Sequence, residues 1–265
     1  MKVTVLGSGT SSGVPTVGCD CQVCLSTDPK DKRRRASLLI ETKDATVLID
    51  TGPDLRDQLL SAQVNSLDFV LLTHYHYDHI GGLDDLRPLS YRAKSAIPCF
   101  VDEDTMGIIA KNMPHVSPSP ENFYGPRLEC REYPQKEGLL QAIDLAGLLV
   151  QPIKMLHVPQ VPIFSIGYVF ENRFAYLTDF KEVLPEYEQF LQNLDTIFIG
   201  APLPKFHPTH QSHEDAFKLL RRLKPKQGII GHLAHSLSHE SMSKDWPEDI
   251  RPAYDGMMLN FSSSH

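Results

Sequence analysis

The chain has 265 residues, 41% of them hydrophobic, and a formal net charge of −7. Such a chain can bury a substantial core, as one large domain or as two fused halves. The acidic balance argues against binding nucleic acid through bulk electrostatics. No stretch approaches the roughly 20 apolar residues that span a bilayer, and the first apolar run is too short for a signal peptide. We therefore expect a cytoplasmic protein without a membrane partner.

Short β-rich runs alternate with amphipathic segments along the chain. Strands are predicted at residues 2–6, 37–42, 46–49, 69–73, 97–101, 149–156, 164–170, 173–178, 195–200 and, as the last clear strand, 226–231, with a tight hairpin turn near Asn172. Helices are predicted after Pro53, at 103–111, from Pro185 through Leu191, and after Ser212 as N-cap. Residues 113–127, rich in Pro, Ser and Asn, are expected to form a surface loop. This order predicts an α/β (α+β) fold, a single domain over residues 1–265 with two sheets and helices outside.

Residues 73–79, Thr-His-Tyr-His-Tyr-Asp-His, carry the strongest functional signal. Three imidazoles and a carboxylate follow a buried strand directly: His74, His76, Asp78 and His79. Because side chains alternate along an extended backbone, His74 and His76 leave the same side and can reach one ion. Asp78 and His79 lie past the strand end and can turn toward a second ion. A polar loop with chance histidines is the alternative, but four such ligands at this spacing rarely occur together.

Further candidate ligands end three other apolar runs. His157, Asp179 and His232 each follow a predicted strand, where the side chains of a sheet can converge on one edge. Taken singly, each is more often a hydrogen-bonded polar residue or a turn residue than a ligand. Together with the first cluster they make seven ligands, about the number that two ions need beside a shared water.

In this order, the four motifs resemble those of the metallo-β-lactamase superfamily of hydrolases. The resemblance implies a four-layer αββα sandwich with the metal site at one sheet edge. It also implies that His74, His76 and His157 hold one ion, that Asp78, His79 and His232 hold the other, and that Asp179 bridges two divalent ions, manganese or zinc. Asp50 resembles the buried aspartate that orients a metal-bound histidine in this family. A turn residue is an equal alternative for Asp50.

Three cysteines are crowded into a C-x-C-x-x-C pattern: Cys19, Cys21 and Cys24. Three thiolates at this spacing can wrap a structural zinc ion, and His235 is the natural fourth ligand. This predicts a zinc knuckle inserted at about residues 18–35, whereas the alternative is three reduced thiols without a metal. The pattern resembles the phosphoribosyl 1,2-cyclic phosphate phosphodiesterases of bacterial phosphonate degradation and related hydrolases.

Several histidines and arginines near these motifs are weaker candidates. By the same resemblance, His210 matches a histidine that protonates the departing alkoxide, with His213 as its rival and a plain surface role as the alternative for both. Arg87 is expected either to contact a phosphate or to pair with Asp84 or Asp85. The basic run at residues 30–35 is interpreted as a solvated face, or else as an attractor of anionic substrates.

The predicted function is hydrolysis of small phosphodiesters, such as a sugar cyclic phosphate, by a hydroxide between two metal ions. The substrate is therefore expected to be a small molecule rather than nucleic acid, and a homodimer is compatible with the sequence. A tRNA 3′-processing endonuclease shares the metal motifs, but the acidic charge argues against it. A member of the pyrroloquinoline quinone pathway shares the cysteine knuckle, but its dinuclear motif is degraded.

Overall fold

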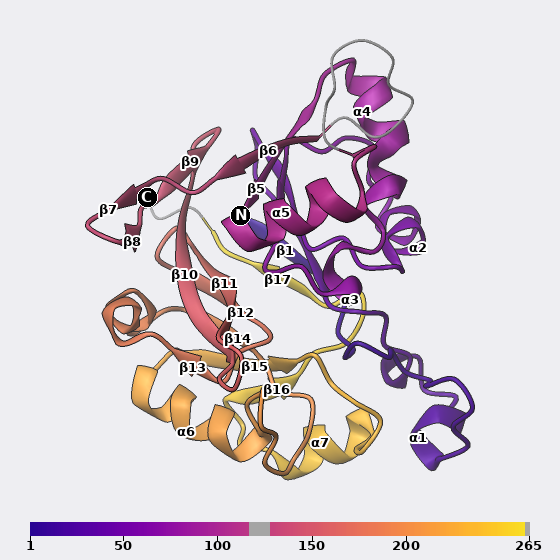
Figure 1. The fold of residues 1–265 in the computed structure, drawn as a ribbon. Helices are drawn as coiled ribbons and strands as arrows, with labels where there is room; N and C mark the ends of the chain where they lie inside the picture. Colours follow the sequence, from indigo (N-terminus) through magenta and orange to yellow (C-terminus); the bar gives the residue numbers. More distant parts are fainter. Residues whose placement is uncertain (117–127, 263–265) are drawn as a thin grey trace.

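The computed structural model describes residues 1–116 and 128–262, which form two large mixed β-sheets (Figure 1). The first sheet has the strand order β17-β1-β2-β3-β4-β5-β6. Its strands are β1 (Lys2–Gly7), β2 (Ser37–Glu41), β3 (Thr46–Ile49), β4 (Phe69–Leu71), β5 (Ile97–Val101), β6 (Leu128–Glu132) and β17 (Met258–Asn260).

The second sheet has the order β13-β10-β11-β12-β14-β15-β16, and β9 also pairs with β10. Its strands are β9 (Ile143–Leu145), β10 (Leu148–Val158), β11 (Ile163–Phe170), β12 (Phe174–Leu177), β13 (Glu182–Val183), β14 (Thr196–Gly200), β15 (Gln227–Gly231) and β16 (Ile250–Pro252). A small hairpin of β7 (Gln135–Lys136) and β8 (Leu139–Leu140) lies between the two sheets in sequence.

The two sheets repeat one pairing scheme. From β1 to β6, successive neighbours pair antiparallel, antiparallel, parallel, parallel and parallel. The series β10, β11, β12, β14, β15 and β16 pairs in the same way. The third strands of the two series, β3 and β12, are each followed closely by an aspartate with positive φ, Asp50 (61°) and Asp179 (53°). The fold therefore consists of two matching halves, although the sequence shows no internal repeat.

Helices cover the outer faces of both sheets, which makes four layers in the order α, β, β, α (Figure 1). Helices α2, α4 and α5 lie over the first sheet, and α6 and α7 lie over the second. The α-helices are α1 (Gln22–Leu25), α2 (Leu55–Ser61), α3 (Tyr77–Ile80), α4 (Arg87–Ala93), α5 (Glu103–Asn112), α6 (His213–Leu223) and α7 (His239–Asp245). The 3-10 helices are η1 (Pro29–Asp31), η2 (Leu83–Leu86) and η3 (Pro185–Leu191). The expected sandwich is confirmed.

The hydrophobic core follows the period-two alternation of the strands. In β2, Leu38 and Ile40 join a cluster that also contains residues of the second sheet, whereas Leu39 faces a separate cluster beneath α2 and α5. Both faces of the first sheet are thus buried at its central strands, and β2, β3 and β4 are nearly continuous apolar runs. Helix α6 is amphipathic, and Ser212 and Asp215 form a reciprocal capping box at its start.

Most predicted elements are confirmed within two residues. The predicted helix from Pro185 through Leu191 is present and is of the 3-10 type. Two further strands, β16 and β17, follow the last clear strand predicted at 226–231; each has only three residues, too few for a periodic signal. The predicted loop at 113–127 lies mostly outside the described residues. In the described ranges, no helix is long and apolar enough to cross a membrane.

Candidate metal centre

The ends of four strands bring the seven candidate ligands together. His74 and His76 lie in the loop after β4, and the one-turn helix α3 carries Asp78 and His79. His157 lies near the end of β10, Asp179 comes two residues after β12, and His232 directly follows β15. Strands β10, β12 and β15 run in the same direction in the second sheet, so their carboxyl ends lie at one edge of it. The chain after β4 of the first sheet reaches the second sheet, where the Thr73 carbonyl accepts a hydrogen bond from Ile166. All seven side chains except His76 are buried.

His74, His76 and His157 form the first group. The Nε2 atom of His74 lies 2.9 Å from Nδ1 of His76, and the rings of both have their centroids 5.1 Å from the ring of His157. The opposite ring nitrogens have backbone or hydroxyl partners: Nδ1 of His74 lies 3.0 Å from Thr73 Oγ1, and Nδ1 of His157 donates to the Thr209 carbonyl at 3.1 Å. These bonds leave Nε2 of His74 and of His157 as candidate ligand atoms, and the ligand atoms of the three histidines lie within 4.8 Å of one another.

Asp78, His79 and His232 form the second group, and Asp179 lies between the two groups. The Asp179 carboxylate is 3.1 Å from His79 Nε2, 3.4 Å from His232 Nε2 and 4.0 Å from His157 Nε2. Asp78 Oδ2 is 3.2 Å from the same nitrogen of His79. One carboxylate therefore contacts imidazoles of both groups, the position expected of a bridging ligand.

The charges of these residues fit divalent cations. Burial lowers the pKa of His74, His76 and His157, so these rings are neutral, the form that binds a metal. Burial disfavours ionisation of Asp179, but nearby His232 and His79 lower its pKa well below the usual range. Burial disfavours the charged form of His79, but Asp50, Asp179 and Asp78 raise its pKa well above the usual range. Its Nδ1–H donates to Asp50, and its Nε2 lies 3.1 Å from Asp179 and 3.2 Å from Asp78, where a divalent cation could replace the proton.

Asp50 is fully buried and holds the loop that carries the histidines. Its Oδ2 accepts the Nδ1–H of His79 at 2.7 Å, and its Oδ1 accepts the backbone N–H of Thr73 at 2.8 Å. The Thr73 hydroxyl, which sequence reasoning missed, bonds both Asp50 and His74. The backbone of Asp50 has φ 61°, and that of Asp179 and of His232 has φ 53°, in the left-handed region that non-glycine residues seldom adopt. Asp50 is thus both a turn residue and a partner of His79.

Replacing Asp50 with asparagine should weaken metal binding about 10- to 100-fold, because loss of a ligand's hydrogen-bonded carboxylate typically has that effect. The variant keeps the shape of the side chain but removes the charge that orients His79. Competition titration of Mn²⁺ or Zn²⁺ against a chelating dye measures the affinity. Asp44→Asn, at an exposed turn, is the control. Equal affinity of the Asp50 variant and the natural protein would contradict this role.

The structure separates the two candidates for a proton donor. His210 Nδ1 lies 3.6 Å from Asp179 Oδ1, and its ring stacks on His232 with centroids 5.5 Å apart. His213 begins α6, is buried, and packs edge-on against Trp246 with ring centroids 5.1 Å apart. Burial lowers the pKa of His210 to about 3 and that of His213 to about 4. Of the two histidines, only His210 lies next to the candidate ligands.

Arg87 and the basic run at residues 30–35, the two candidate anion-binding features, form ion pairs with carboxylates of the chain itself. Arg87 pairs with Asp84 at 3.4 Å on the surface, where His115 also contacts Asp84 at 3.0 Å. The interpretation of residues 30–35 as a solvated face is wrong, because the three arginines of that run are paired. Arg33 is 1% exposed and lies 3.0 Å from Asp31, and Arg34 and Arg35 pair with Asp255 and Asp54.

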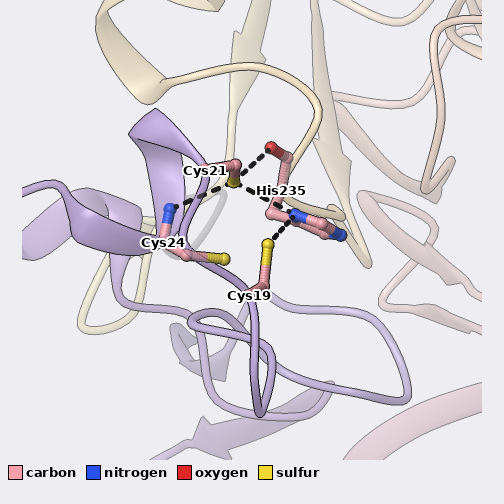
Figure 2. A group of neighbouring side chains, drawn as sticks. All are labelled: Cys19, Cys21, Cys24 and His235. Carbon is pink, nitrogen blue, oxygen red and sulfur yellow. Dashed lines mark hydrogen bonds between the residues drawn. The ribbon is translucent and has the colours of Figure 1, made fainter.

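The three cysteines and His235 form a separate group beside helix α1, which projects from the sandwich on the long β1–β2 connection. Figure 2 shows the four side chains turned toward one another. His235 Nδ1 lies 3.3 Å from Cys21 Sγ and 3.5 Å from Cys19 Sγ, and all four donor atoms lie within 4.8 Å of one another. The His235 hydrogen bond lowers the pKa of Cys21 to about 6, so its thiolate is present at neutral pH.

Comparisons with known proteins agree with this architecture. Residues 45–233 match the family described as Beta-lactamase superfamily domain. The chain is 37% identical over 264 residues to an octanoyltransferase of Porphyromonas gingivalis, a match that covers 97% of this chain but 51% of that protein. The chain therefore spans about half the length of this relative.

Two solved structures are similar over nearly the whole chain. A crystal structure named as a new diphosphatase from the PhnP family has 36% identity and a TM-score of 0.88, and the match covers 98% of this chain and 96% of that one. The Zn²⁺-bound PqqB of Methylobacterium extorquens has 16% identity and a TM-score of 0.76, with 98% and 100% covered, which shows the shared fold alone. The chain belongs to the metallo-β-lactamase superfamily of metal-dependent hydrolases.

Proposed function

We propose that the chain hydrolyses small phosphodiesters with two divalent cations. The observation that supports this most is the position of Asp179, whose carboxylate contacts His79, His232, His157 and His210 within 4.0 Å. His74, His76 and His157 would hold one ion and Asp78, His79 and His232 the other, with Asp179 between them. Imidazole and carboxylate donors suit zinc, manganese or iron. When bound, the ions would activate water and offset charge on the phosphoryl oxygens.

His210 would donate a proton to the departing oxygen. Its ring is 15% exposed, at the edge of the buried cluster, where a substrate can reach it. With its pKa lowered to about 3, the ring is neutral while no substrate is bound. An anionic diester beside the ring would favour the protonated form, because a nearby opposite charge raises the pKa of an imidazole. The proton would then pass to the oxygen as the P–O bond breaks.

The solved structure with 36% identity supports phosphorus chemistry, since it is named as a diphosphatase. The octanoyltransferase relative favours a second candidate, hydrolysis of an acyl thioester. We would assay the metal-loaded protein against bis(p-nitrophenyl) phosphate, a ribose cyclic phosphate, a precursor tRNA and an octanoyl thioester. The proposal expects metal-dependent turnover of the first two. Turnover of the thioester alone would replace it with the second candidate, and cleavage of the tRNA alone would indicate a nuclease.

We also propose that Cys19, Cys21, Cys24 and His235 hold one structural zinc ion. The cluster joins the β1–β2 connection to the segment after His232, so a bound zinc would fasten the two. Cys21→Ser should remove about one equivalent of zinc from the purified protein, because three-ligand sites hold zinc less tightly than closed four-ligand sites. Elemental analysis gives the zinc content, with Cys130→Ser as the control. Equal zinc content in the Cys21 variant would contradict a zinc knuckle.

A further inference from the structure

One lysine connects three of the segments that carry the candidate ligands. Lys181 comes two residues after Asp179, and its side chain is 18% exposed. Its backbone N–H donates to the carbonyl of Leu156, the residue before His157, at 2.7 Å. Its carbonyl accepts a hydrogen bond from the side chain of Gln211, the residue after His210. The backbone of Lys181 thus binds the segments on both sides of the cluster.

The Lys181 ammonium group reaches into the loop that carries His210. Nζ donates to the carbonyl oxygen of His210 at 3.1 Å and lies 3.6 Å from Asp215 Oδ2. It also lies 4.6 Å from the ring centroid of Phe206, whose side chain is 75% exposed on the same loop. Hydrogen bonds from a charged donor are stronger than neutral ones. The ammonium therefore holds the backbone of His210 itself.

The loop between β14 and α6 is attached on both sides of His210. Thr209 accepts the bond from His157, the Gln211 side chain donates to the Lys181 carbonyl, and the capping box of Ser212 and Asp215 fixes the start of α6. His210 lies between these anchors, on a stretch without regular structure. The position of its ring relative to Asp179 hence depends on what holds its own backbone. Small displacements of a proton donor lower the rate strongly, because proton transfer needs hydrogen-bonding distance.

We propose that Lys181 is a positioning residue that fixes His210 beside the departing oxygen, an inference that rests on the proposed function. Loss of the ammonium group would let the His210 loop shift and would weaken proton donation. Substrates differ in how much they need that proton. A p-nitrophenolate ion is a stable leaving group, whereas phenolate is less stable and departs faster when it is protonated. The defect should therefore grow as the leaving group becomes more basic.

The test is the slope of log kcat/KM against the pKa of the leaving phenol. It is measured with bis(p-nitrophenyl) phosphate, bis(p-chlorophenyl) phosphate and diphenyl phosphate. Lys181→Met should lower the value for diphenyl phosphate about 10- to 100-fold and that for the nitrophenyl ester less than about threefold. Lys181→Arg keeps a charged donor and should retain the natural slope. Lys218→Met is the control, because Lys218 is 68% exposed on α6 and pairs with Glu214. Phe206→Leu, on the exposed loop, should steepen the slope less than Lys181→Met.

Each result decides between the inference and simpler explanations. A steeper slope in Lys181→Met, with the natural slope in Lys181→Arg and Lys218→Met, supports the inference. An equal loss for all three esters would overturn it and give Lys181 only a structural role. If Lys181→Met does not fold, an unchanged slope in Phe206→Leu would overturn it instead. A natural protein that hydrolyses none of the esters overturns the proposed function, and the inference with it.

Discussion

Asp179→Asn is expected to lower metal-dependent diester hydrolysis by on the order of a thousandfold, the largest effect of any single substitution. The carboxylate lies within 4.0 Å of three imidazoles from the two groups of candidate ligands, and of His210. Its low pKa keeps it anionic at neutral pH. An amide has nearly the same shape but no charge, so it cannot bridge two cations in the same way. The variant should therefore lose metal as well as activity.

Elemental analysis and turnover of bis(p-nitrophenyl) phosphate, measured on the same sample, test this expectation. Asp249→Asn is a matched control, because Asp249 is exposed and precedes β16. A folded Asp179 variant that keeps two active-site metals and full turnover would show that this carboxylate is not part of the reaction. Loss of metal without loss of turnover would show that the activity does not depend on the candidate metal centre.

Arg33→Met is expected to destabilise the protein by about 3–5 kcal/mol, because it leaves the charge of a buried partner unpaired. Arg33 is 1% exposed and Asp31 2% exposed, and they lie 3.0 Å apart. Arg33 also donates to the carbonyls of Ala234 and Leu237, which flank His235. The arginine therefore fastens the cysteine-rich connection to the segment after β15.

Thermal unfolding of the metal-loaded protein measures this effect. A loss of that size corresponds to a fall in Tm of roughly 6–20 °C in a chain of this length. Arg131→Met is the control, because Arg131 pairs with Glu129 on the surface, where such pairs contribute about 0–1 kcal/mol. A Tm for Arg33→Met within a degree or two of the control would contradict a stabilising role for the buried pair.

The sequence predicted the parts of the fold and of the candidate site that depend on local pattern. Strand ends followed from apolar runs, and polar residues at those ends identified His157, Asp179 and His232. Spacing within residues 73–79 placed His74 and His76 on one side of the chain. The grouping of these residues with one another came from the resemblance to the superfamily, which the fold comparisons confirm.

Features that depend on long-range contacts could not be predicted. Arg33 is in a run of charges that usually faces solvent, but its partners include carbonyls more than 200 residues away in sequence. The Thr209 carbonyl that orients His157 is a backbone group, and it carries no sequence signal. The sequence around Lys181 is that of an ordinary surface lysine, and only the fold brings its ammonium group to the carbonyl of His210. The positive φ values of Asp50, Asp179 and His232 likewise follow from packing rather than residue type.

Stepwise addition of Mn²⁺ to metal-free protein, with turnover of bis(p-nitrophenyl) phosphate recorded at each step, tests the two-metal phosphodiesterase most directly. Zinc at the proposed cysteine site is counted as the difference in metal content between the natural protein and the Cys21→Ser variant. The proposed function predicts that turnover rises and levels off at two equivalents of metal beyond that zinc. Two tightly bound equivalents without turnover at any loading would contradict it and would direct the search to acyl thioesters.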